Sequence, residues 1–129
     1  MKTHILLIDD DIDEMKTFVE AFKEVVGAFK CTYAANGIHA LKMLLYLQPE
    51  AIFAACNMPG MDGLQVAEEV KKINHLQDIP FFLYATNFNP LTREKARQLG
   101  VSACLEKPST IAGLSTLLKK VLPVPQEKT

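Results

Sequence analysis

The sequence predicts an α/β fold built on a parallel sheet, because short apolar stretches alternate five times with stretches of helical periodicity. The apolar stretches are nearly continuous rather than alternating with polar residues, which is typical of strands that are buried on both faces. Helices are therefore expected on both sides of the sheet. Five strand–helix units within 129 residues fit one domain of ordinary size.

Five strands are predicted from apolar runs bounded by polar or turn-forming residues. They cover residues 4–8, 30–34, 51–55, 81–85 and 103–106. The run at 30–34 is more polar than the others, which suits an edge strand. The run at 51–55 contains no polar residue and therefore suits a fully buried strand.

Five helices are predicted from apolar residues that recur on one face. They cover residues 12–26, 37–47, 63–74, 89–99 and 110–121. Asp62 and Gln65 have the spacing of a capping box before the third helix. Asn89 and Pro90 have the pattern of an N-cap and a first helical residue for the fourth helix. Gly100 is expected to end that helix.

The strict alternation of these elements indicates a flavodoxin-like doubly wound (βα)5 fold, with a five-stranded parallel sheet of order 2-1-3-4-5. Ligands of such sheets bind at the carboxyl ends of the strands, near the switch point between strands one and three. We therefore expect Asp9, Asp10 and Ala55 to meet there. Residues 1–122 are predicted to form the single domain, and the Pro-interrupted residues 123–129 a short frayed tail.

The composition is that of an ordinary soluble globular domain, with 49% hydrophobic and 22% charged residues. The net charge of -1 gives no basic surplus for binding nucleic acid. The longest apolar runs are strand-sized, which argues against a membrane span, and no targeting segment is recognised. Three widely spaced cysteines fit a reducing compartment, so a cytoplasmic location is expected.

The segment at 51–63, AIFAACNMPGMDG, is the most informative part of the chain. A buried strand ends at Ala55 and is followed by Met-Pro-Gly-Met-Asp-Gly at 58–63. An acidic triplet at 9–11 follows the first strand, and Lys107 with Pro108 follows the fifth. In combination, these motifs resemble a response-regulator receiver domain of the CheY-like superfamily. The resemblance covers roughly residues 3–122.

This resemblance implies a stand-alone signalling protein of a two-component phosphorelay, but the family's phosphoswitch is altered at three positions. The acceptor aspartate of the family is replaced by Ala55, whose methyl group has no nucleophilic oxygen. The serine or threonine that ends the fourth strand is replaced by Ala85, and Thr86 would substitute only if the loop bulges. The aromatic switch position holds Cys104. We interpret the chain as a pseudo-receiver that acts as a phosphorylation-independent protein-interaction module.

The remaining pocket residues are also assigned by the resemblance. Asp9, Asp10 and the backbone carbonyl of Asn57 would hold Mg²⁺, which prefers oxygen ligands and keeps several waters. Loss of the carboxylate at Ala55 is expected to weaken that binding. Lys107 stands where the family has the lysine that reaches the phosphoryl group. Without an acceptor, we expect Lys107 to pair with Asp9 or Asp10, because opposite charges stabilise each other.

Two alternative functions are left open by the sequence. A relocated acceptor, Asp10 or Asp62, would keep the switch, although in-line transfer needs a positioned oxygen, metal and lysine. Asp9 and Asp11 also have the spacing of a magnesium-dependent phosphatase motif, but that class needs a longer chain. Asp11 and Asp13 are interpreted as charges that cap the first helix.

We expect no enzymatic activity from this chain. The resemblance implies a protein partner, which is a histidine kinase, a phosphotransfer protein or an output protein. That partner would bind the surface formed by the fourth helix, the fifth strand and the fifth helix. Neither nucleic acid nor a membrane is an expected partner, and the chain is expected to be a monomer or a weak homodimer.

Overall fold

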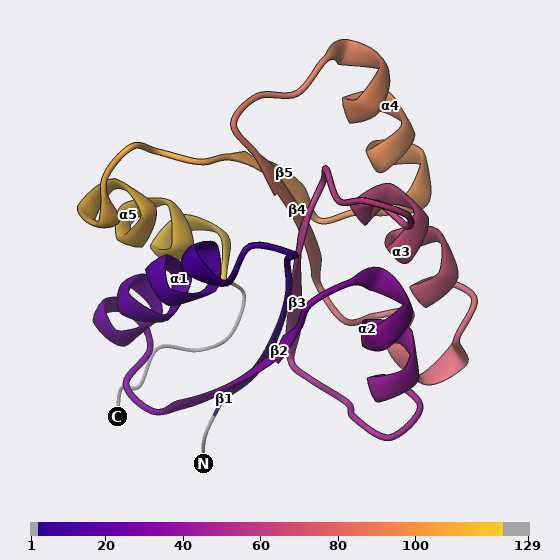
Figure 1. Ribbon diagram of the computed structural model, residues 1–129, viewed down its shortest axis with the longest axis horizontal. Coiled ribbons are helices and arrows are strands. Elements are labelled where there is room, and N and C mark those ends of the chain that lie inside the picture. Colours follow the sequence, from indigo (N-terminus) through magenta and orange to yellow (C-terminus); the bar gives the residue numbers. More distant parts are fainter. Residues whose placement is uncertain (1–2, 123–129) are drawn as a thin grey trace.

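The computed structural model describes residues 3–122, and these residues form the predicted α/β fold (Figure 1). One sheet contains β1 (Thr3–Ile8), β2 (Phe29–Ala34), β3 (Ala51–Ala55), β4 (Phe81–Ala85) and β5 (Ala103–Glu106). The strand order is β2-β1-β3-β4-β5, as predicted, and all neighbouring strands are parallel. The predicted tail at 123–129 lies outside the described residues.

Helices cover both faces of this sheet. On one face lie α1 (Ile12–Val25) and α5 (Ile111–Val121), which pack against each other. On the other face lie α2 (Gly37–Met43), α3 (Gly63–Val70) and α4 (Pro90–Leu99) (Figure 1). No helix within residues 3–122 is long and apolar enough to cross a membrane.

Aromatic side chains fill the core between the sheet and α1. The Phe18 ring centroid lies 4.5 Å from that of Tyr84 and 5.9 Å from that of Phe53. Phe53 in turn stacks on Phe82, with centroids 4.8 Å apart. All four side chains are buried, and each such burial contributes about 1.5–3 kcal/mol. This packing holds α1 against β3 and β4.

The predicted helix caps are confirmed. Asp62 and Gln65 form the capping box of α3, each side chain accepting a 2.9 Å hydrogen bond from the other residue's backbone N–H. Asn89 caps α4 by accepting a 2.8 Å bond from the Thr92 N–H. Gly100 ends α4 in the left-handed conformation, with φ 82°, which residues with a side chain rarely adopt.

Two helices end earlier than their apolar periodicity predicts. The helix α2 ends at Met43 rather than at residue 47, because the N–H groups of Leu45 and Tyr46 bond the carbonyls three residues earlier. Both side chains are exposed, so the apolar pattern there does not mark a buried helical face. After α3, the same tightening precedes a short 3-10 helix, η1 (Asn74–Leu76).

Candidate functional site

An acidic pocket of about 270 Å³ lies at the carboxyl ends of β1, β3 and β4. The residues that line it are Asp9, Asp10, Asp11, Glu14, Ala55, Asn57, Tyr84, Ala85, Thr86 and Lys107. The pairing of Ile8 with Ala54 in the sheet places the next residues, Asp9 and Ala55, at the same edge. The tertiary structure thus brings together the predicted pocket residues, whereas Cys104 lies half-buried on β5 and is absent from the lining.

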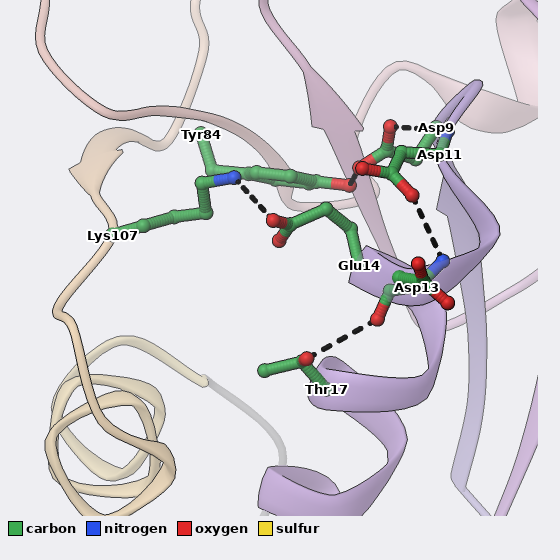
Figure 2. A network of polar contacts seen from close by, with 7 residues as sticks. All are labelled: Asp9, Asp11, Asp13, Glu14, Thr17, Tyr84 and Lys107. Carbon is green, nitrogen blue, oxygen red and sulfur yellow. Dashed lines mark hydrogen bonds and ion pairs between the residues drawn. The ribbon is translucent and has the colours of Figure 1, made fainter.

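Asp9 is the buried carboxylate of the pocket, with 3% of its surface exposed. Its Oδ2 atom accepts a 2.6 Å hydrogen bond from the Tyr84 hydroxyl, and its Oδ1 atom accepts a 3.0 Å bond from the Asp11 N–H (Figure 2). Burial raises the pKa of Asp9 above its ordinary value, and these two hydrogen bonds oppose that rise. Asp10, by contrast, is exposed.

Tyr84 is the donor in this buried pair. Burial raises the pKa of the Tyr84 phenol well above its ordinary value, and the charge of Asp9 adds to the effect. The phenol therefore keeps its proton at neutral pH and donates a hydrogen bond to the carboxylate. Its ring also packs against Phe18, so the hydroxyl is held in one direction by the core.

Lys107 pairs with Glu14, and the prediction of Asp9 or Asp10 as its partner is wrong. The Lys107 Nζ atom lies 3.0 Å from Glu14 Oε2, and the two side chains are 23% and 31% exposed. The Tyr84 ring lies between Lys107 and Asp9, with its centroid 5.6 Å from Nζ (Figure 2). Asp9 already accepts the Tyr84 hydroxyl, while Glu14 extends from the first turn of α1 directly toward the ammonium group.

The two alanines that the resemblance assigns to the phosphoswitch lie at the ends of their strands. Ala55 and Ala85 are buried at the ends of β3 and β4, with 7% and 6% of their surfaces exposed. Both residues line the pocket, and neither side chain carries an oxygen or nitrogen atom. Thr86 is exposed and also lines the pocket, from the loop that follows β4.

The alternative acidic residues occupy different places. Asp62 is absent from the lining of this pocket, and its carboxylate is used to cap α3. Asp10 lines the pocket from the loop after β1. Asp11 caps α1 through a 2.9 Å bond from the Asp13 N–H to its Oδ1 atom, as predicted.

The pocket contains oxygen donors, which are the ligand atoms that Mg²⁺ prefers. Both oxygens of Asp9 already accept one hydrogen bond each, and Asp10 is the second carboxylate. Asn57 lines the same pocket, while Ala55 adds no oxygen beyond its backbone. Within the described part of the chain, no three His, Cys, Asp or Glu side chains group closely enough to hold a metal ion.

Three further side chains, which were not predicted as site residues, shape the pocket. Tyr84 lies in the predicted strand at 81–85, and the sequence carries a signal for its role, because a buried tyrosine hydroxyl usually finds a hydrogen-bond partner. Glu14 lies three residues after the N-cap Asp11, on the turn that faces the pocket. Tyr33 donates a 2.6 Å hydrogen bond to the Asp9 carbonyl, and the strand pattern contains no signal for that contact.

Comparisons with known proteins identify the family and the fold of this chain. The family described as response regulator receiver domain matches residues 5–119. Chemotaxis protein CheY-3 of Vibrio cholerae is 28% identical over 116 residues, which cover 90% of this chain and 89% of CheY-3.

Two solved structures share the fold. Chemotaxis protein CheY4 of Vibrio cholerae superposes with a TM-score of 0.83 at 22% identity, over 95% of this chain and 100% of CheY4. The receiver domain of a sensor histidine kinase from Pseudomonas aeruginosa superposes with a TM-score of 0.78 at 23% identity, over 96% and 100% of the two chains. That second structure has a magnesium ion coordinated in its active site cleft.

Proposed function

Because this chain belongs to the response regulator receiver domain family of two-component signalling, we propose that it is a pseudo-receiver, a protein-interaction module that works without being phosphorylated. The observation that carries the proposal is Ala55 at the end of β3, inside the acidic pocket. An alanine methyl group offers no oxygen for a phosphoryl group. The other pocket residues surround a position that has lost its nucleophile.

The state of the neighbouring groups supports this proposal. Phosphoryl transfer depends on a positioned oxygen, a metal ion and a cation that are aligned on the phosphoryl group. Asp9 is buried and hydrogen-bonded to Tyr84, and Lys107 is engaged by Glu14. Ala85 leaves the end of β4 without a hydroxyl group. Each departure removes or occupies a group that transfer would require.

A weak Mg²⁺ site is part of the proposal. Asp9, Asp10 and the backbone carbonyl of Asn57 would hold the ion, and the ion would neutralise part of the negative charge in the pocket. The chain's own residues keep their roles without it. Asp9 accepts the Tyr84 hydroxyl, and Glu14 neutralises Lys107.

The proposed partner is a protein of the same signalling system, which is a histidine kinase, a phosphotransfer protein or an output protein. We place its binding surface on α4, β5 and α5 of a single domain spanning residues 1–122. Leu91 of α4 and Ile111 of α5 are large apolar side chains that are 64% and 41% exposed. The Arg93–Glu106 ion pair, 2.7 Å long, ties α4 to β5 on this surface. The proposed assembly state is a monomer or a weak homodimer, and nucleic acid is not a proposed ligand.

One observation favours a second candidate function, a receiver phosphorylated at Asp10. That carboxylate is exposed and lines the pocket, whereas Asp62 is used as a helix cap. Phosphatase activity is not part of the proposal. A nucleophile at Asp9 would have to leave its hydrogen bonds from Tyr84 and Asp11.

The test is the intact mass of the chain after incubation with acetyl phosphate and Mg²⁺, with the Ala55→Asp variant beside it. We expect the variant to gain the mass of one phosphoryl group and the native chain to gain none. A phosphorylated native chain would overturn the proposal, and peptide mapping would show whether Asp10 is the acceptor. A parallel assay with a chromogenic phosphate ester tests for turnover; activity that Asp9→Asn abolishes would contradict the absence of catalysis.

A further inference from the structure

Lys107 is the first residue after β5, and its ammonium group pairs with the carboxylate of Glu14 on α1. The two groups come from distant parts of the sequence and lie 3.0 Å apart. Figure 2 shows the contact extending across the pocket, beside the Tyr84 ring. The first turn of α1 is therefore linked to the segment that connects β5 to α5.

The surroundings of this pair make it stronger than an ordinary surface contact. Its side chains are 23% and 31% exposed, whereas those of the Lys23–Glu20 pair on the same helix are 60% and 57% exposed. Exposed pairs are screened by water and salt and contribute about 0–1 kcal/mol, while partly buried pairs are screened less. The Tyr84 ring excludes water from one side of the ammonium group.

The acidic pocket explains why the carboxylate needs this cation. Glu14 and Asp10 both add to the rise in the Asp9 pKa, so these negative charges repel one another. A further carboxylate is tolerated there because the Lys107 ammonium group compensates its charge. In return, the Glu14 carboxylate supplies Lys107 with an anionic partner, which the methyl group of Ala55 cannot do.

Glu106, the residue before Lys107, contacts a helix on the opposite face of the sheet. Successive side chains of a strand point to opposite faces. Glu106 accordingly pairs with Arg93 of α4, whose guanidinium group lies 5.2 Å from the centroid of the Phe88 ring. The carboxyl end of β5 is thus linked to α4 on one side and to α1 on the other.

We propose that the Glu14 carboxylate is an intramolecular anionic partner of Lys107. The contact between them holds the segment after β5 in one position without a phosphoryl group. This inference rests on the proposed function, because it names what engages Lys107 when the acceptor is absent. The pair acts by position: Glu14 fixes Lys107, and the backbone of Lys107 donates a 3.0 Å hydrogen bond to the Ala85 carbonyl. Loss of Glu14 should loosen this connection and the turn that leads into α5.

The experiment is hydrogen exchange measured by mass spectrometry on the full chain. Glu14→Gln keeps the size of the side chain but removes its charge. We expect the amides of residues 105–114 to exchange about two- to fivefold faster than in the native chain. Loss of the ion pair lowers the free energy of local opening, and these amides exchange through that opening. Glu20→Gln, which removes a carboxylate from the exposed pair on the same helix, should leave these amides unchanged.

A second pair of variants keeps the inference testable if Glu14→Gln loosens the whole fold. Lys107→Gln should accelerate the same amides, and the double variant should add little beyond either single variant, because the two residues act through one contact. Independent, additive effects would overturn the inference. The inference would also be overturned if the amides of residues 105–114 exchanged at the same rate in Glu14→Gln as in Glu20→Gln.

Failure of this inference is distinguishable from failure of the proposed function. A native chain that gains a phosphoryl group overturns the proposed function, whatever the exchange rates are. If the native chain gains no phosphoryl group, and the exchange of the 105–114 amides is unchanged in Glu14→Gln, only the role of Glu14 is overturned.

Discussion

The hydroxyl of Tyr84 lies 2.6 Å from the Oδ2 atom of Asp9, and this hydrogen bond joins β4 to the segment that leaves β1. Asp9 is buried, whereas Asp10 beside it is exposed. Two adjacent carboxylates of one pocket therefore have different environments. The buried carboxylate of Asp9 accepts a hydrogen bond from a core side chain, whereas the exposed carboxylate of Asp10 is accessible to ions and water.

Removing the Tyr84 hydroxyl should destabilise the fold. Tyr84→Phe keeps the ring in the core but leaves one oxygen of a buried carboxylate without its donor, which costs about 1–3 kcal/mol. The measurement is urea unfolding, read from the midpoint at constant slope. Tyr46→Phe is the control, because Tyr46 is 87% exposed. Equal midpoints for the two variants would contradict a structural role for the bond.

Asp9 should make the stability of the chain depend on pH. The folded pKa of Asp9 is raised by burial above that of the unfolded chain, so folding favours the protonated form. The stability contributed by that proton is fully present below the unfolded pKa and is lost as pH rises through the folded pKa. Asp9→Asn does not titrate and still accepts the Tyr84 hydroxyl.

The check is a series of thermal melts of the native chain and Asp9→Asn in buffers that contain a chelator. The melting temperature of the native chain relative to the variant should fall as pH rises from about 4 toward neutrality. A difference that stays constant, or one that changes in the opposite direction, would show that Asp9 does not have a raised pKa.

Introducing a carboxylate at position 55 should strengthen Mg²⁺ binding. Ala55→Asp adds a carboxylate to a pocket in which Asp9 and Asp10 are the other candidate metal ligands. We expect a dissociation constant lower by about tenfold or more, because each added charge at close range attracts a divalent cation. Isothermal titration calorimetry measures the affinity. Asp62→Asn is the control and should leave it unchanged, since Asp62 is outside the lining of this pocket.

The close approach of α3 to β3 should make Gly63 intolerant of a side chain. A Cβ atom at Gly63 would lie 2.5 Å from the backbone oxygen of Ala55 and 2.6 Å from Leu83 Cδ2. Because a backbone atom cannot yield, Gly63→Ala should cost about 3 kcal/mol. At Gly60, with φ 77°, a Cβ meets no atom within 4 Å, so Gly60→Ala should cost only the left-handed strain of about 1–2 kcal/mol. Urea unfolding that ranks the two variants in reverse would contradict this packing.

Much of the fold could be predicted from the sequence because its signals are local. Strand and helix order follows from the period of the apolar residues, and the caps at Asp62, Asn89 and Gly100 depend on neighbours a few residues away. The parallel order of the sheet then puts Asp9 and Ala55 at one edge. The helix ends were predicted less well, since Leu45 and Tyr46 continue an apolar pattern beyond the last turn of α2.

The five strand–helix units, the acidic residues after β1 and the alanine at the end of β3 could all be read from the sequence. The tertiary structure decided which carboxylate meets Lys107 and which side chain meets Asp9. Asp9 and Asp10 were the expected partners of Lys107, but burial, the Tyr84 ring and the direction of α1 selected Glu14. Such choices depend on distances between residues far apart in the chain, and no local pattern encodes those distances.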